Sequence, residues 1–243
     1  MTVRQTDVHY WNRDNFEGLA QLADALRGDA RLDDLARYCE LRERGLRTEA
    51  FEALNRFLDA ALASTLEARR EIVLRVLGAH ARTATAHQFL SRPLRQRLLE
   101  PVLKSWCESE PGSVTPVAEL GLLQRDPELL ERALHMERSH DRARACLVSI
   151  LLGQVDYATH HLVEGRLIGT LENACSLLEA AERHLGAAAD ATSMSGLAAE
   201  AAEIRGLLDD WKAYQENPSG TFPEWCQQRS RAHRWWTVVY HDA

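Results

Sequence analysis

The stretch Phe16-Glu-Gly-Leu-Ala-Gln-Leu-Ala-Asp-Ala-Leu26, followed by Arg27 and Gly28, carries the helical pattern on which the predicted fold rests. Its apolar residues recur every three or four positions, which is the spacing that lines one face of an α-helix. Gly28 follows the last apolar position, and a glycine there commonly ends a helix in a left-handed conformation. The stretch therefore predicts an amphipathic helix that ends just before Gly28.

The same spacing recurs along the rest of the chain, with glycines, prolines and helix-capping residues between the segments. Alanine and leucine dominate the composition and β-branched residues are scarce, which favours helix over strand. We therefore expect no sheet. The expected helices cover residues 16–27, 29–44, 48–62, 66–90, 93–106, 116–124, 126–139, 141–162, 171–185 and 196–217, with a short one from Pro223.

Residues 110–116, Glu-Pro-Gly-Ser-Val-Thr-Pro, concentrate the residues that interrupt helices. They predict a boundary between an N-terminal helical subdomain, residues 1–112, and a C-terminal one, residues 113–243, within one continuous helical array. Residues 113–160 resemble the helix pairs of HEAT-like and tetratricopeptide-like stacks in length and patterning. Since no repeat signature recurs, the sequence predicts an all-α protein built as an irregular stack of antiparallel helix pairs.

The chain carries no signal-peptide pattern at its N-terminus and no apolar stretch long enough to cross a membrane, so we expect a cytoplasmic protein. Arginine outnumbers lysine 27 to two, which is typical of a GC-rich bacterial genome. The odd number of cysteines and the absence of CxxC spacing argue against a disulfide framework or a structural zinc site. The expected free thiols are Cys39, Cys107, Cys146, Cys175 and Cys226.

Charge is distributed unevenly along the chain. Residues 151–216 hold eleven acidic residues against four basic ones, a difference of −7 that equals the net charge of the whole protein. Residues 66–100 hold seven arginines against three glutamates. Such asymmetry favours a basic protein partner, or pairing between the two segments, over a nucleic-acid surface. The candidate partner-binding residues are Glu172, Glu179, Glu182, Asp209, Asp210 and Trp211.

One segment carries the spacing of a metal site. Asp156, His160 and Glu164 lie four residues apart, so on a continuous helix they would share a face and offer two carboxylates and an imidazole to a divalent metal. The HExxH motif is absent, and Glu164 next to Gly165 is close to a helix end. We favour a structural role for these residues and keep the metal site as the alternative.

Other motifs are weaker. Glu137 and His140 form a single ExxH element, whereas a diiron bundle needs two. His140-Asp141 is similar to the doublet of HD-type phosphohydrolases, but Asp141 is equally explained as a helix cap. The aromatic tail, with Phe222, Trp225, Trp235 and Trp236, favours core packing, with a partner interface as the alternative. Motifs for nucleotide binding and acyl transfer are absent.

The sequence thus favours a non-catalytic helical scaffold that binds a basic protein through an acidic surface, without a cofactor. In general character, an acidic chain of this size without catalytic motifs looks like the bacterial immunity proteins that neutralise basic toxins, or like an adaptor. No residue role follows from that resemblance. The alternative is a metal-dependent helical enzyme centred on Asp156, His160 and Glu164.

Overall fold

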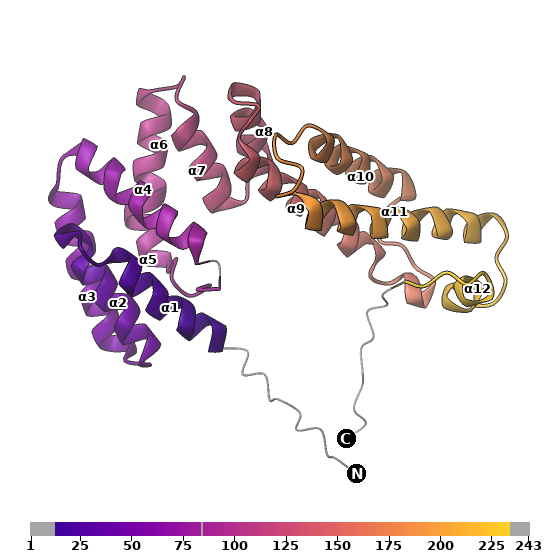
Figure 1. Cartoon of the computed structure of the whole chain (residues 1–243), viewed down its shortest axis with the longest axis horizontal. Coiled ribbons are helices and arrows are strands. Elements are labelled where there is room, and N and C mark those ends of the chain that lie inside the picture. The colour runs from indigo at the N-terminus through magenta and orange to yellow at the C-terminus, as the bar shows by residue number, and fades with distance from the viewer. Residues whose placement is uncertain (1–12, 84, 234–243) are drawn as a thin grey trace, which may run out of the picture. The chain divides into compact units, whose positions relative to one another are not determined.

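The computed structural model describes residues 13–83 and 85–233, and the regular secondary structure within these ranges is entirely helical. The predicted all-α class is confirmed, and adjacent helices pack pairwise in series (Figure 1). Every helix in the described ranges is too short or too polar to cross a membrane. In the aromatic tail, Phe222 and Trp225 are buried, as expected for core packing, whereas Trp235 and Trp236 lie outside the described residues.

The chain forms two compact units that divide between Glu119 and Leu120. This division falls inside helix α7 (Val114–Gln124), whereas the boundary expected from the sequence lies in the turn just before α7. The first unit contains α1 (Arg13–Leu26), η1 (Ala30–Leu32), α2 (Asp33–Glu43), α3 (Arg47–Ala63), α4 (Leu66–Arg82), α5 (Arg92–Leu94), η2 (Arg95–Leu99) and α6 (Glu100–Ser109).

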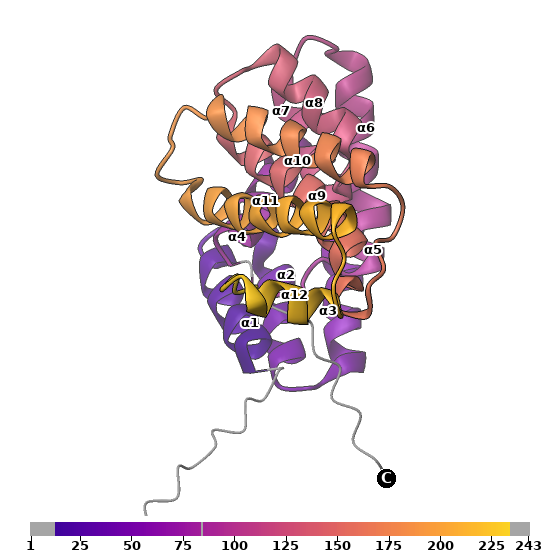
Figure 2. The ribbon, with the colours of Figure 1, turned by 90° about the vertical axis from the view of Figure 1, so that its right-hand side faces the viewer.

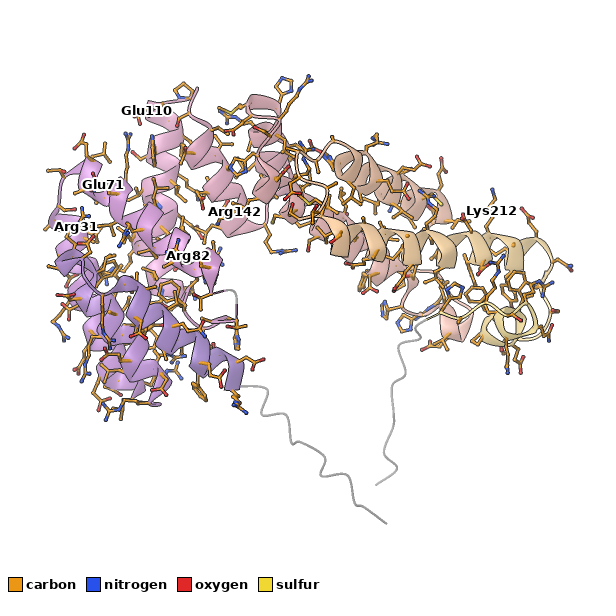
Figure 3. All side chains as sticks on the ribbon, in the orientation of Figure 1. Arg31, Glu71, Arg82, Glu110, Arg142 and Lys212 are labelled. Atoms are coloured by element: carbon orange, nitrogen blue, oxygen red, sulfur yellow. The ribbon has the colours of Figure 1, made fainter. Side chains whose placement is uncertain are left out.

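In the first unit, α1 packs on α2, α2 on α3, and α4 contacts α1, α3 and α6. The apolar positions that predicted α1 are buried, since Leu19, Leu22 and Leu26 are at most 1% exposed. Gly28 has a φ of +91°, as expected for a glycine at the end of this helix. Arg31 and Glu71 form an ion pair of 2.8 Å between η1 and α4, and both are labelled in Figure 3.

The helix predicted over residues 66–90 is wrong beyond Arg82, where α4 ends. The following turn, residues 83 and 85–91, is held by tertiary contacts. Phe89 is fully buried, the Tyr38 hydroxyl donates to the Gln88 carbonyl at 3.4 Å, and the Gln88 amide donates to Asn15 Oδ1 at 3.1 Å. Docking of this turn against α1 and α2 outweighs the helical propensity of its residues.

Residues 92–109 form one helical run that contains a π-helical turn, η2. Pro101 has no N–H to donate within the run. Just before it, the Glu100 amide donates to the Arg95 carbonyl, five residues back, which widens the helix. The single helix expected from Pro93 is therefore present, with a local irregularity at the proline.

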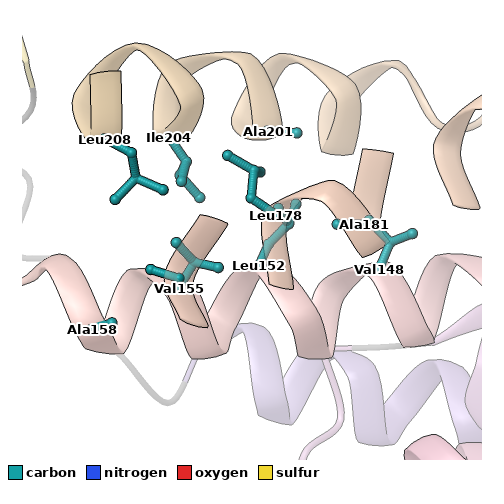
Figure 4. Close-up of a cluster of buried hydrophobic side chains, with 10 residues drawn as sticks. Val148, Leu152, Val155, Ala158, Leu178, Ala181, Ala201, Ile204 and Leu208 are labelled. Atoms are coloured by element: carbon teal, nitrogen blue, oxygen red, sulfur yellow. The ribbon is translucent and has the colours of Figure 1, made fainter. Parts of the chain in front are cut away.

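The second unit contains α8 (Pro127–Met136), α9 (Asp141–Thr159), η3 (Leu162–Glu164), α10 (Leu171–Gly186), α11 (Ser195–Glu216) and α12 (Phe222–Gln228). Helices α9, α10 and α11 pack on one another, and their facing alanine, valine, leucine and isoleucine side chains form a buried cluster (Figure 4). Helix α12 packs on α11 and η3 (Figure 2). This three-helix packing leaves the outer faces of α10 and α11 to carry the candidate site.

Candidate functional site

Helix α10 presents acidic side chains because its apolar positions face inward. Ala174, Leu178 and Ala181 are fully buried at spacings of four and three residues. Glu172, two positions before Ala174, and Glu179, just after Leu178, face away from this stripe and are exposed. Glu172 is in the first helical turn, where the backbone amides favour a negative charge. Both carboxylates are therefore available on the outer surface of α10.

Glu182, further along α10, forms an ion pair with a neighbouring helix. Arg205 of α11 donates to its carboxylate twice, from Nε at 3.1 Å and from Nη2 at 2.6 Å. This two-point hydrogen bond raises the pKa of Arg205 above its ordinary value. Glu182 thus fastens α10 to α11, and its charge is largely neutralised.

The two adjacent acids of α11, Asp209 and Asp210, also differ in exposure. Asp209 is exposed, whereas the Asp210 side chain is only 13% exposed. Asp210 accepts from His233 Nε2 at 2.8 Å and forms an ion pair of 3.5 Å with Arg231 Nε. The carboxylate of Asp210 therefore ties the residues that follow α12 to α11.

Trp211 belongs to the core and is 3% exposed. It packs edge-on against Phe222, with ring centroids 5.0 Å apart, in a cluster that also contains Leu162, Trp225 and Cys226. Its indole Nε1 has no hydrogen-bond partner among the described residues. Trp211 packs the C-terminal part of α11 against this cluster and exposes almost no surface to a partner.

The six predicted partner-binding residues are thus separated by their environments. Glu172, Glu179 and Asp209 point to solvent, Glu182 and Asp210 are paired within the second unit, and Trp211 is buried. No family model, curated protein or solved structure matches this chain. The chemistry of the surface therefore follows from its own residues.

The structure does not bring the metal trio together on one helix face. Helix α9 ends at Thr159, so His160 caps it, and Glu164 lies at the end of η3. His160 Nδ1 donates to the Tyr157 carbonyl at 2.6 Å, and Glu164 pairs with His161 Nδ1 at 3.1 Å. Within residues 13–83 and 85–233, no group of three or more histidine, cysteine, aspartate or glutamate residues is arranged to hold a metal ion.

The His140-Asp141 doublet accepts hydrogen bonds from backbone amides. His140 Nδ1 accepts from the Ala143 amide at 3.2 Å and caps α9, the role that the sequence assigned to Asp141. Asp141 instead accepts from the amides of Ala189 and Asp190, at 3.1 and 3.0 Å. These amides hold the pKa of the Asp141 carboxyl below its usual range. The doublet therefore joins the start of α9 to the loop after α10.

Three arginines of residues 66–100 form ion pairs within the first unit. Arg70 pairs with Glu110 at 2.6 Å and lies 4.8 Å from the centroid of the Trp106 ring. Arg97 pairs with Asp59 at 2.7 Å, and Arg95 with Glu100 at 3.1 Å. This arrangement distributes the positive charge among local partners, which does not favour a phosphate-binding surface.

Two acids on α11 were not singled out by the sequence reasoning. Glu200 and Glu203 are exposed in the first half of α11, beside small residues. The available signal was their spacing of three residues on a helix whose other face carries Ala201, Ile204 and Leu208. These two glutamates extend the acidic surface beyond the residues predicted to form it.

Proposed function

We propose that this protein is a non-catalytic helical scaffold that binds a basic protein partner through the acidic surface of α10 and α11. The observation that carries the proposal is the exposure of Glu172, Glu179 and Asp209 in the segment that holds the net negative charge of the chain. An exposed field of one sign raises the rate of encounter with a partner of the opposite sign.

The surroundings of the exposed acids pair little of their charge, with Asp209 attracted by Arg205 at longer range. Glu172, Glu179 and Asp209 make no hydrogen bond or ion pair with any described residue. Of the two basic side chains of α11, Arg205 is paired with Glu182, and the other is Lys212, labelled in Figure 3. An immunity protein that neutralises a basic toxin, or an adaptor for a basic protein, would use such a surface.

The test reverses the charge of the exposed acids only, since reversal of Glu182 or Asp210 would also break an ion pair inside the unit. The variant carries Glu172→Lys, Glu179→Lys and Asp209→Lys. Affinity capture from the source cell should retain a basic partner on the wild-type protein and lose most of it on the variant. Raising the salt should weaken the wild-type complex, because exposed charges are screened over about 8–10 Å.

The control variant makes the same change in charge on the first unit, at exposed acids that form no ion pair among the described residues: Glu49→Lys, Glu52→Lys and Glu67→Lys. It should retain the partner as the wild type does, and all three proteins should have similar melting temperatures. The proposal is wrong if the three proteins retain the same partners at low and moderate salt, or if none retains a partner.

The rival function is a metal-dependent enzyme that uses Asp156, His160 and Glu164. The end of α9 at Thr159 separates these side chains, and Glu164 has His161 as its partner. These observations favour the scaffold, because a catalytic metal needs about three protein ligands that converge on one point. A metal assay discriminates the two functions and is given in the Discussion.

A further inference from the structure

A groove of about 1030 Å³ lies along the first half of α11, within the second unit. Its walls come from α11, from the end of α9 and from residues 232–233. Along α11 it extends from Gly196 to Leu207, which is a length of roughly 16 Å at 1.5 Å per residue. The groove is therefore long enough for about three turns of a second helix.

Small residues line the α11 side of the groove. Gly196, Ala199, Ala202 and Gly206 recur at intervals of three or four, so they share a face of the helix. A Cβ atom added at Gly196 or Gly206 would meet nothing within 4 Å. Helix surfaces made of small side chains allow the backbone of a second helix to approach closely, and Leu207 adds apolar contact.

The charged residues of the groove are predominantly acidic. Asp156 contributes from α9, Glu200 and Glu203 contribute from α11, and His233 is the one basic residue among those that line it. Glu200 makes no hydrogen bond or ion pair with a described residue. An apolar strip bordered by carboxylates is complementary to an apolar strip bordered by arginine or lysine.

A helix fits this groove better than an extended peptide does. An extended peptide pairs its backbone N–H and C=O groups best along a sheet edge, and the described residues contain no strand. The polar side chains on the α11 side of the groove are carboxylates, which accept from N–H groups but cannot donate to C=O groups. A helix satisfies these groups internally and buries an apolar stripe. The shape and the charge of the groove therefore both favour an amphipathic helix with basic side chains.

We propose that the α11 groove is the seat of the basic partner and that it takes an amphipathic helix with a small apolar stripe flanked by arginine or lysine. This inference rests on the proposed function, because it identifies where on the acidic surface the partner binds. It adds a requirement for shape that a diffuse acidic field does not make. Filling the groove must weaken binding even when every charge is kept.

The probe is a fluorescent synthetic helix of about 18 residues, long enough to populate helix in water, with a leucine and alanine stripe flanked by arginines. Two control peptides replace its arginines by glutamates or its leucines by serines. Fluorescence anisotropy with the full-length protein measures the dissociation constants. The wild-type protein should bind the probe at least tenfold more tightly than either control peptide.

Two pairs of matched variants locate the binding site. Glu200→Lys with Glu203→Lys changes the groove, and Glu172→Lys with Glu179→Lys makes the same change in charge on α10. Ala199→Trp fills the groove without a change of charge, and Ser176→Trp places the same side chain on the exposed face of α10. Each groove variant should weaken probe binding about tenfold. Each α10 variant should weaken it less than threefold, because the short probe is confined to the groove and does not reach the α10 acids that the whole partner contacts.

The outcomes separate the two proposals. Equal losses for the two charge pairs, together with unchanged binding by Ala199→Trp, overturn the groove and leave the acidic surface standing. Failure of the wild-type protein to prefer the probe over its control peptides also overturns the groove. The proposed function is judged by the captured partner and the triple reversal described above, so it fails or stands independently. Circular dichroism confirms that each variant keeps its helices.

Discussion

At the scale of single residues, Gly18 is a position at which α1 closely approaches the turn after α4. A Cβ atom there would lie 2.8 Å from Thr85 Oγ1 and 2.9 Å from the Ala86 backbone nitrogen. Such overlap costs about 1–3 kcal/mol, more than the roughly 0.5–1 kcal/mol that alanine gains over glycine in a helix. Gly18→Ala should therefore lower the free energy of unfolding by about 1 kcal/mol, measured by urea denaturation.

Gly153 is the matched control for this substitution. It is an exposed glycine within α9, and a Cβ atom there would meet nothing within 4 Å. Gly153→Ala should raise the free energy of unfolding by about 0.5–1 kcal/mol, because only the helix preference of alanine acts. Equal effects of the two substitutions would show that the turn does not pack closely on Gly18.

Cys226 gives the stability of the protein a dependence on alkaline pH. Its side chain is 1% exposed among Trp211, Phe222 and Trp225, and burial, aided by the negative charge of Asp210, raises the pKa of its thiol to about 11. The unfolded thiol ionises near pH 8.5–9, so the folded state binds more protons than the unfolded state between there and about pH 11. Stability is complete below this window and is lost as the pH rises through it.

The free energy of unfolding of the wild-type protein should therefore fall by up to about 2–3 kcal/mol more than that of Cys226→Ala between about pH 8.5 and 11. The comparison uses the pH dependence of each protein, since the substitution also removes packing at every pH. Cys39 is buried and its thiol pKa is raised as well, but it is present in both proteins. Parallel pH profiles would contradict the assignment to Cys226.

At the scale of elements, most helix ends follow from short-range signals. Asp126 precedes Pro127, and its carboxylate accepts from the amides of Glu128 at 2.9 Å and Leu129 at 3.2 Å. Asp126→Ala should lower the free energy of unfolding by about 1 kcal/mol, because these amides at the start of α8 lose their acceptor. Asp126→Asn keeps an acceptor oxygen and should retain most of the stability in the same urea titration. Equal losses for the two variants would contradict the capping role.

The turn after α4 illustrates where short-range signals fail. Residues 83–90 carry an alanine-rich pattern compatible with helix, yet the Gln88 amide is held by Asn15, more than seventy positions earlier in the chain. The aromatic ring of Phe89 is buried by the same docking. Contacts over that sequence distance are invisible to a periodicity of 3.6 residues, so the predicted helix extends too far.

At the scale of the whole molecule, charge is paired locally where basic and acidic side chains lie close together and remains exposed where they do not. Arg70 and Arg97 pair with Glu110 and Asp59, whereas Glu172, Glu179 and Asp209 are exposed to solvent. This contrast supports the proposed binding surface on the acidic segment.

The metal assay belongs to this scale because it concerns the purified protein as a whole. Full-length protein, incubated with zinc, iron or manganese and then desalted, should carry well below one equivalent of metal by elemental analysis, because Asp156, His160 and Glu164 do not converge. The His160→Ala variant is the control. A stoichiometric metal that is lost from His160→Ala would favour the enzyme and sink the scaffold.

The sequence by itself determined the helical class, nearly all of the helices and the asymmetry of charge. These properties depend on neighbours within a few positions, which the order of residues contains directly. It also identified Glu172, Glu179 and Asp209, which the structure leaves on the surface.

The tertiary structure alone shows which acids form internal ion pairs and which side chains are buried. Asp210 pairs with His233, Glu182 pairs with Arg205, and Trp211 is buried against α12. These contacts join segments that are separated in the sequence. The α11 groove also exists only because α9 and residues 232–233 come to lie beside it. Such proximities are set by the packing of whole helices, in which the burial of apolar area outweighs any local preference of a single side chain.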